Sequence, residues 1–252
     1  MNIRTVFLSL IFCTVVFLYE TKTCLAVSEF KSGPEQVSLL ELYSSEGCSS
    51  CPPADEWISQ FQNHPDLWKK FVPAVFHVTY WDRIGWKDRF ASPEFDERQK
   101  AYVAAWKGWN VSTPSVVLNG EEWDSWPESK KIPDPPQKQI GVLSVKALDA
   151  QEYLTTFKPI VPISNPLEIH GALLGFAVSS HILEGENVGK TLAHHFLVLN
   201  YRKKELPPGE GNFVTSVVFA LSKKSESARL AVAFWITEKG KTVPLQAAGS
   251  FV

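Results

Sequence analysis

The chain has 252 residues, 44% of them hydrophobic, and a formal net charge of −2 at pH 7. This length allows one large or two ordinary domains, and a nearly neutral chain without a run of Lys and Arg argues against a nucleic-acid partner. Met1 is the only methionine, which excludes a methionine-rich copper site.

The first segment, residues 1–26, is predicted to be a signal peptide. It has a basic start, an apolar stretch from Thr5 to Tyr19 that is too short for a comfortable membrane span, and a small-residue cleavage site at Cys24-Leu25-Ala26. The exported protein would begin with a tail over residues 27–36, would have no membrane span after cleavage, and would be secreted or periplasmic. A retained N-terminal anchor is the alternative.

A pair of cysteines follows, between a predicted strand and a predicted helix. The apolar run Val37–Tyr43 indicates a buried strand. Cys51-Pro52-Pro53 is predicted to open a helix, which continues through Ala54–Phe61 with one apolar face. Between them stand Cys48 and Cys51, the two of the four cysteines that remain after signal cleavage. A single closely spaced pair of cysteines is a redox-active pair, a pair of metal ligands or a local structural disulfide, rather than part of a disulfide-rich scaffold.

Residues 71–78 are a second predicted buried strand, and they lead into an aromatic, charged loop over residues 80–90. His77 stands near the end of the strand, and Trp81 and Asp82 lie at the start of the loop. The aromatic side chains either line a groove for a peptide or an apolar ligand, or form a small satellite core. The two options stay open because a loop in solution rarely exposes so much aromatic surface without use.

A helix is predicted between Ser92 and about Trp106, because Ser at the N-cap, then Pro, then an acid start helices. Thr113-Pro114 precedes a third strand, residues 115–118, and Asn119-Gly120 is the turn of a hairpin. The order of elements is that of thioredoxin without its last helix. In that order a cis peptide bond is expected at Thr113–Pro114, beside the cysteines.

Residues 125–139 are rich in Pro, Lys, Ser and Asp and are predicted to be a linker or a surface excursion. From residue 140 the pattern changes to short strands separated by turn signals, which favours an antiparallel sandwich. The expected fold is therefore an α/β thioredoxin-like domain over residues 37–124, followed by an all-β, sandwich-like domain over residues 140–252. The predicted strands of the second part are 141–147, 152–157, 167–178, 191–203, 212–221, 229–238 and 243–252.

The cysteine pair carries the most specific chemistry of the sequence. In a C-x-x-C pair one thiolate attacks and the other resolves the mixed disulfide. We assign Cys48, the first and normally the more exposed cysteine, as the nucleophile and Cys51 as the resolving thiol. A bound substrate chain would lie along Thr113 and Pro114, with Trp81 beside it.

His77 and Asp82 are candidate auxiliary residues of this site. Three roles are open for His77. It is a proton shuttle, a partly buried histidine whose ring forms hydrogen bonds with the backbone, or a third metal ligand beside Cys48 and Cys51. Soft thiolates suit Cu(I), and the set distantly resembles that of the copper-delivery proteins of cytochrome oxidase assembly. Those proteins have a C-x-x-x-C pair, which counts against this alternative.

Two blocks are specific enough to identify relatives: residues 41–55, which read E-L-Y-S-S-E-G-C-S-S-C-P-P-A-D, and residues 77–88, which read H-V-T-Y-W-D-R-I-G-W-K-D. They resemble a bacterial family of exported thioredoxin-like proteins of unknown function. Its patterns are E-L-F-T-S-Q-G-C-S-S-C-P-P-A-D and H-V-D-Y-W-D-x-L-G-W-x-D. Thr113-Pro114 with Asn119-Gly120, and residues 185–192, are similar to two further blocks. The resemblance implies export and a thioredoxin-like fold, without an established substrate, and Thr79 departs from the family's usual Asp.

The sequence thus favours a secreted or periplasmic thiol–disulfide oxidoreductase. Its partners would be protein thiols or disulfides, or a redox partner, and it would need no cofactor. The first alternative is a non-catalytic thioredoxin-like binding protein with a structural disulfide. The second is a copper-binding or other metal-binding module that uses Cys48, Cys51 and His77.

Overall fold

The computed structural model describes residues 29–220, 227 and 229–252, and the predicted signal peptide lies outside them. Within these residues, no helix is both long and apolar enough to span a membrane. The helices are α1 (Pro52–Ser59), α2 (Pro93–Ala105) and the short 3-10 helices η1 (Gln60–Asn63) and η2 (Asp82–Ile84). The strands are β1 (Glu29–Lys31), β2 (Ser38–Ser44), β3 (Phe71–His77), β4 (Ser115–Leu118), β5 (Glu121–Glu122), β6 (Gly141–Ala147), β7 (Glu152–Pro159), β8 (Leu167–Phe176), β9 (Val178–His181), β10 (Thr191–His194), β11 (Leu197–Leu206), β12 (Phe213–Val218), β13 (Arg229–Glu238) and β14 (Pro244–Phe251).

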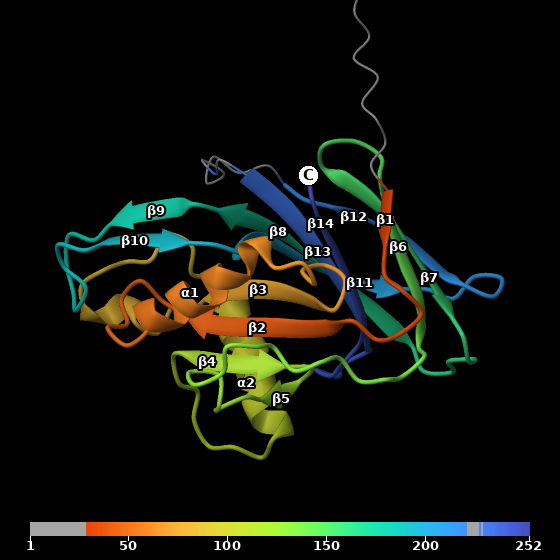
Figure 1. Ribbon diagram of the computed structural model, residues 1–252, viewed down its shortest axis with the longest axis horizontal. Helices are drawn as coiled ribbons and strands as arrows, with labels where there is room; N and C mark the ends of the chain where they lie inside the picture. Colours follow the sequence, from red (N-terminus) through yellow and green to blue (C-terminus); the bar gives the residue numbers. More distant parts are fainter. Residues whose placement is uncertain (1–28, 221–226, 228) are drawn as a thin grey trace, which may run out of the picture.

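An eight-stranded sheet forms the centre of the molecule, in the order β14-β13-β8-β11-β3-β2-β4-β5 (Figure 1). β2 runs parallel to β3 and antiparallel to β4, with Leu42 opposite both Val75 and Val116. On the other side of β3 lies β11, from the C-terminal half, in parallel orientation. Long antiparallel pairs then join β11 to β8 and β8 to β13. Strands from both halves of the chain therefore form one continuous sheet.

This sheet overturns the predicted fold class, an α/β thioredoxin-like domain followed by an all-β domain. The described residues are mostly strand, and their two α-helices have 8 and 13 residues. Both β2 and β3 are buried along their whole length. An interior strand needs a hydrogen-bonding partner on each side, and β11 is the second partner of β3. The separate α/β sheet that the local pattern predicted therefore does not exist.

A second sheet, β1-β6-β7-β12, shares a hydrophobic core with the β8 and β13 part of the large sheet. Along β13, Phe234 and Ile236 belong to this core, whereas Ala233 and Trp235 belong to the core on the other face. Because alternate residues of a strand point to opposite faces, β13 is covered on both sides. The positions of β6, β7 and β13 confirm the strands predicted at 141–147, 152–157 and 229–238.

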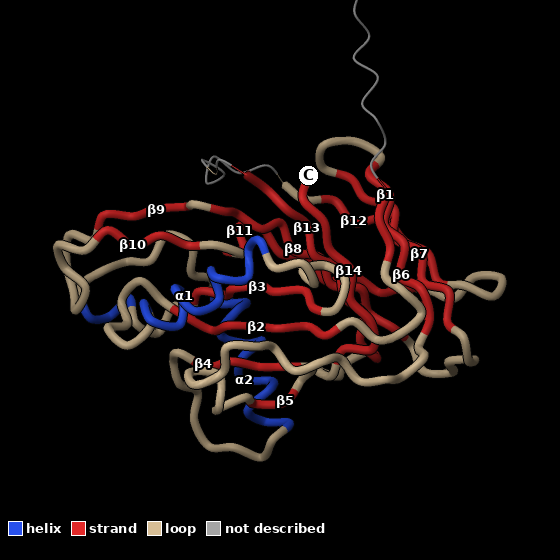
Figure 2. The backbone as a smooth tube through the Cα atoms, viewed as in Figure 1, coloured by secondary structure: helices blue, strands red, loops and turns tan. Residues whose placement is uncertain are grey.

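Two predicted strands, 167–178 and 191–203, are each divided in two. Ala177 has a φ of 52° and separates β8 from β9, and Phe196 has a φ of 57° and stands between β10 and β11. The left-handed region is unfavourable for such residues and breaks an extended strand. As a result β9 and β10 form a separate antiparallel hairpin, which extends beyond the large sheet beside α1 (Figure 2).

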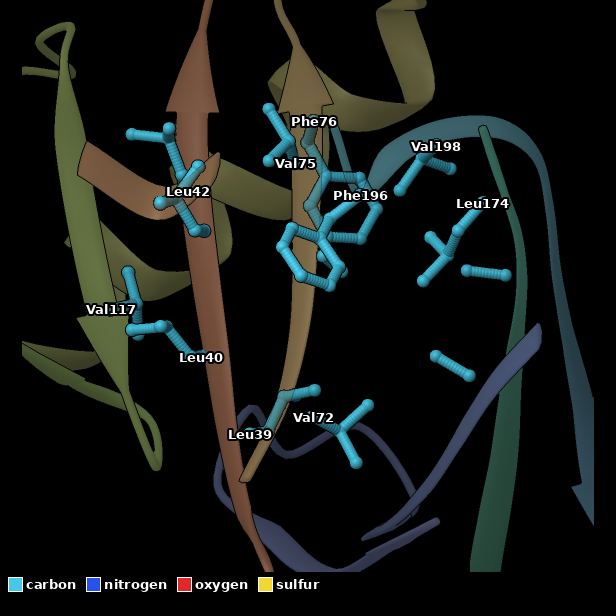
Figure 3. Close-up of a cluster of buried hydrophobic side chains, with 14 of the residues drawn as sticks. Leu39, Leu40, Leu42, Val72, Val75, Phe76, Val117, Leu174, Phe196 and Val198 are labelled. Atoms are coloured by element: carbon cyan, nitrogen blue, oxygen red, sulfur yellow. The ribbon is translucent and has the colours of Figure 1, made fainter. Parts of the chain in front are cut away.

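The other hydrophobic core lies against β2 and β3 and is closed by the helices. Figure 3 shows Leu40, Leu42, Val75 and Phe76 of these strands gathered with residues of β4, β8 and the segment before β11. The expected helix starts are confirmed: Pro52 and Pro53 open α1 after Cys51, and Ser92 caps α2, its hydroxyl accepting the backbone N–H of Glu94. The helices bury Trp57, Ile58, Phe95 and Tyr102 in this core.

A buried ion pair joins α2 to the sheet. Glu41 in β2 is completely buried, and Nε of Arg98 in α2 donates a hydrogen bond to its carboxylate at 2.7 Å. The hydroxyl of Tyr102 donates to the same carboxylate, and the Arg98 guanidinium lies 5.0 Å from the ring centre of Trp235. A buried carboxylate needs such partners because its desolvation is costly. The pair therefore holds α2 in a defined position on the sheet.

Candidate functional site

The cysteine pair lies on the turn between β2 and α1. Cys48 and Cys51 are at disulfide distance, with their Cα atoms 5.4 Å apart, a normal separation for a disulfide. Cys51 is the N-cap of α1, and two prolines occupy the first helical positions. Proline is tolerated there because those N–H groups have no partner within the helix. The C-x-x-C segment is thus held at the junction of a buried strand and a helix, as the sequence predicts.

Both cysteines are completely buried, although Ser49 and Ser50 between them are exposed. This differs from the expectation that Cys48 is the more exposed of the two. The loop between β9 and β10 lies over the turn: Asn187 Nδ2 donates to the carbonyls of Glu46 and Cys48, both at 2.9 Å. The connection between these strands of the C-terminal half therefore covers the cysteine pair.

The peptide bond Thr113–Pro114 is cis, which confirms the prediction made for it. The carbonyl oxygen of Thr113 lies 3.8 Å from Sγ of Cys48. Nε1 of Trp81 donates to the Thr113 hydroxyl at 2.6 Å, and the hydroxyl of Ser50 donates to the Thr113 carbonyl at 3.4 Å. The structure brings Thr113, Pro114 and Trp81 together beside Cys48, and all three are partly exposed. That they bind substrate stays a prediction.

His77 belongs to a buried polar cluster below the cysteine pair. Asp55, four residues after Cys51 in α1, lies in this cluster and its backbone N–H donates to the Cys51 carbonyl. Facing ligand atoms of Asp55, His77 and His194 lie within 4.8 Å of one another. The rings of His77 and His194 are 4.8 Å apart and nearly perpendicular. The cluster thus joins α1, β3 and β10.

Two further carboxylates surround the histidines from outside. Nδ1 of His77 is 2.7 Å from a carboxylate oxygen of Asp88, and Nε2 of His194 is 3.2 Å from Glu46. Asp88 also accepts the backbone N–H groups of Glu46 and Phe90, at 2.9 Å each. Trp86 Nε1 donates to the other oxygen of Glu46 at 2.7 Å. These additional hydrogen bonds therefore hold both carboxylates in position beside the histidines.

The charges of this cluster shift its pKa values strongly. Burial opposes the charged form of His77, but the negative charges of Asp88, Asp55 and Glu46 outweigh it and raise the pKa of His77 to about 9. Burial also opposes the charged form of Asp88, yet His77 and the backbone donors lower the pKa of Asp88 to about 2. Burial raises the pKa of Asp55 above its usual value. Hydrogen bonds, first of all that with His194, outweigh burial and lower the pKa of Glu46.

Asp82, the other candidate auxiliary residue, lies outside this cluster. One of its carboxylate oxygens accepts the backbone N–H of Asp88 at 3.1 Å, and Asp82 stands at the start of η2. Partial burial raises the pKa of Asp82. It lines a surface cavity together with Thr79, Lys87 and Asp88. Asp82 thus supports the loop that carries Asp88, and its predicted role at the cysteines stays untested.

The sequence interpretation missed Glu46, Asp55, Asp88 and His194. Of these, Asp55 had a local signal, because residue i+4 from Cys51 lies one helical turn below it. His194, the last residue of β10, is buried, whereas the next residue, His195, is half-buried. No local pattern indicates that His194 contacts His77, because the two residues are 117 positions apart in the sequence and only the tertiary fold brings them together.

Comparisons with known proteins give one matching family and solved structures of similar fold. The sequence model of a family described as "Protein of unknown function (DUF1223)" matches residues 39–237. No curated protein matches the chain. The solved structure of protein AGR_C_4864 from Agrobacterium tumefaciens has a TM-score of 0.59 and 23% identity, covering 86% of this chain and 95% of that chain. HBP35 of Porphyromonas gingivalis has a TM-score of 0.57 and 13% identity, covering 86% of this chain and 75% of that one. At such identities the likeness shows the fold alone.

Proposed function

The chain belongs to the DUF1223 family of proteins of unknown function, and for this chain we propose thiol–disulfide exchange at the Cys48–Cys51 pair. The observation that carries the proposal is the position of the partly exposed residues Thr113 and cis-Pro114, since the Thr113 carbonyl oxygen lies 3.8 Å from the Cys48 sulfur. A substrate chain that pairs with this backbone would present its sulfur to Cys48. The partners are protein thiols and disulfides.

The exchange conserves electrons and needs no further cofactor. A substrate thiolate attacks Sγ of Cys48, the Cys48–Cys51 bond breaks, and the electron pair leaves on the Cys51 sulfur. A second substrate thiolate then displaces Cys48, so the substrate gains a disulfide and the pair is reduced to two thiols. The reverse sequence reduces a substrate disulfide.

Export to an oxidising compartment is part of the proposal. Disulfides persist in secreted and periplasmic proteins and are rare in the cytosol. The apolar N-terminal segment supports export, and the closely spaced cysteine pair of the folded chain is consistent with it.

Because both cysteines are buried, the segments that cover them must move before thiol–disulfide exchange can occur. A thiolate must approach the attacked sulfur in line with the disulfide, and Cys48 is completely buried in the closed form. Trp81 packs over Gly47, where an added Cβ would lie 3.1 Å from the Trp81 Cβ. We expect exchange to require displacement of Trp81 or of the β9–β10 connection.

Redox titration tests the proposal. The folded chain is equilibrated with glutathione buffers, and the fraction of free thiols is read by alkylation and mass spectrometry. We expect a reversible potential in the range of roughly −270 to −120 mV found for exchange proteins. A Cys51→Ser variant is expected to retain a mixed disulfide after its Cys48 thiolate attacks a model peptide disulfide and displaces one peptide thiolate, whereas Cys48→Ser is the matched control that retains less.

Complete burial also favours a second function, a structural disulfide that fixes the β2–α1 turn in a non-catalytic binding protein. In that case the pair would resist reduction until the protein unfolds, and Cys51→Ser would capture no peptide. This result would rule out exchange and support the structural role.

A further inference from the structure

The buried cluster below the cysteine pair contains two imidazole nitrogens that no hydrogen bond satisfies. Nε2 of His77 and Nδ1 of His194 are both buried and lack a partner within the described part of the chain. Unsatisfied buried polar atoms are costly and rare in folded proteins. Nδ1 of His194 lies 3.8 Å from a carboxylate oxygen of Asp55, and one ligand atom of each of Asp55, His77 and His194 lies within 4.8 Å of the other two. Three ligand atoms thus converge on one small volume.

The outer nitrogen of each histidine is already fixed by a carboxylate. Asp88 holds Nδ1 of His77, and Glu46 holds Nε2 of His194. When the outer N–H donates to a carboxylate, the inner nitrogen is free to bind a metal ion once it has lost its proton, and metal binding drives that loss. This carboxylate–histidine arrangement orients ligands at metal centres in proteins. Both His77 and His194 have this arrangement, and the two histidines lie next to each other.

The distances suit a metal ion after a small contraction. Two ligands bound tetrahedrally to Zn²⁺ at about 2.1 Å lie roughly 3.4 Å apart. Nδ1 of His194 is 3.8 Å from Asp55, and the three ligand atoms lie within 4.8 Å of one another. Side-chain movements of a few tenths of an ångström to about 1 Å would bring them to bonding positions.

We propose that Asp55, His77 and His194 form a buried site for one divalent transition-metal ion of the Zn²⁺ class, with Asp88 and Glu46 orienting the histidines. Imidazole and carboxylate ligands suit this class of ion. Three protein ligands leave a further coordination position for water or another small ligand. The ion pairs of the three carboxylates in the cluster are made with the two histidines. A divalent cation therefore also offsets a concentration of buried negative charge.

The proposed ligands lie in the interior, and the side chain of Asp88, which bonds His77, is completely buried as well. The site does not depend on exchange at the cysteines, because its ligands exclude both sulfurs. Metal binding is accordingly tested with the disulfide intact.

Zinc titration of chelator-treated, oxidised protein tests the proposal, with calorimetry or competition against a chromophoric chelator as the readout. We expect one Zn²⁺ per chain. His77→Gln and His194→Gln should each abolish tight binding, and Asp88→Asn should weaken it about 10–100-fold, as expected for an orienting carboxylate. His195→Gln is the matched control, since the neighbouring histidine stands outside the cluster, and it should bind as the wild type does.

Cobalt substitution provides a second measurement that uses the wild-type protein and therefore does not depend on the folding of a histidine variant. The absorption spectrum of the Co²⁺ form of the wild-type protein should show nitrogen and oxygen ligands, without a sulfur-to-metal band. A sulfur band, binding that His194→Gln leaves unchanged, or absence of stoichiometric binding would each overturn the proposal. Failure of cysteine exchange would leave these results unaffected, so the two proposals fail independently.

Discussion

At the scale of single residues, the unusual feature is how many ionisable side chains are buried with specific partners. His170 of β8 is an example. Its ring lies between the hydroxyls of Tyr201 at 2.6 Å and Thr237 at 3.0 Å, and it stacks on Trp235 with ring centres 5.2 Å apart. Burial, together with the positive charges of Arg98 and Lys203, lowers the pKa of His170 well below its usual value. His170 is therefore neutral in the folded protein.

This shift predicts a pH-dependent stability. An unfolded histidine binds a proton below about pH 6.5, whereas folded His170 does not, so the free energy of unfolding should fall as pH decreases below that value. The slope attributable to one proton is about 1.4 kcal/mol per pH unit. In His170→Gln this contribution is lost. The stability difference between wild type and variant should therefore shrink from pH 7.5 to pH 5.

Urea unfolding of both proteins across this pH range measures the difference. Other titrating groups, including His77, are present in both proteins, and their contributions largely cancel. Parallel stability curves for wild type and variant would contradict the predicted pKa shift.

At the scale of elements, the β9–β10 hairpin determines access to the cysteines. It exists because the chain leaves the large sheet after β8 and re-enters it at β11, at Ala177 and Phe196. Its connection carries Asn187, which is completely buried and bonds the carbonyls of Glu46 and Cys48. The Cys48 carbonyl also accepts the backbone N–H of Cys51 at 3.3 Å. The two Asn187 bonds to the turn hold the connection closed, because opening it breaks both of them.

Asn187→Ala is expected to accelerate reduction of the native disulfide. Two hydrogen bonds at about 1 kcal/mol each correspond to a roughly 10–100-fold larger population of the open form. The measurement is the rate of Cys48–Cys51 reduction by dithiothreitol in the folded protein. Asn200→Ala is the matched control, since the Asn200 side chain donates to the carbonyl of Ala220, away from this turn. Equal rates in both variants would show that the hairpin does not control access.

At the scale of the whole molecule, the large sheet connects both halves of the chain. The core beside β2 and β3 contains residues from both halves, among them Phe76, Phe196, Tyr201 and Trp235. The segment before residue 140 therefore buries its apolar side chains against residues that follow it. The domain boundaries predicted from the sequence stay a prediction. Because the sheet is shared, a fragment of the chain tests whether the first predicted domain folds alone.

A chain of residues 29–139 is expected to remain without a cooperative fold. It would expose the edge of β3 that β11 covers and would lose part of the core described above. Urea unfolding followed by circular dichroism, compared with residues 29–252, provides the measurement. A cooperative transition of the fragment would show instead that the segment is an independent domain.

The local elements follow from the amino-acid sequence alone. Helix starts at Pro52 and Ser92, the cis bond at Thr113–Pro114, and most strands were predictable, because caps, turn residues and hydrophobic periodicity act within a few residues. The same holds for the place of the cysteine pair between strand and helix. The fold class was predicted wrongly because local order does not specify which strands become neighbours.

Three features of the molecule arise only from its tertiary structure. β11 lies beside β3, and the β9–β10 connection covers the cysteines. His194 lies next to His77 and Asp55. These contacts join residues far apart in the sequence. They depend on which surfaces bury the most apolar area and satisfy the most polar groups together. The C-x-x-C motif was therefore readable from the sequence, whereas its burial and the polar cluster below it arise from packing of the whole chain.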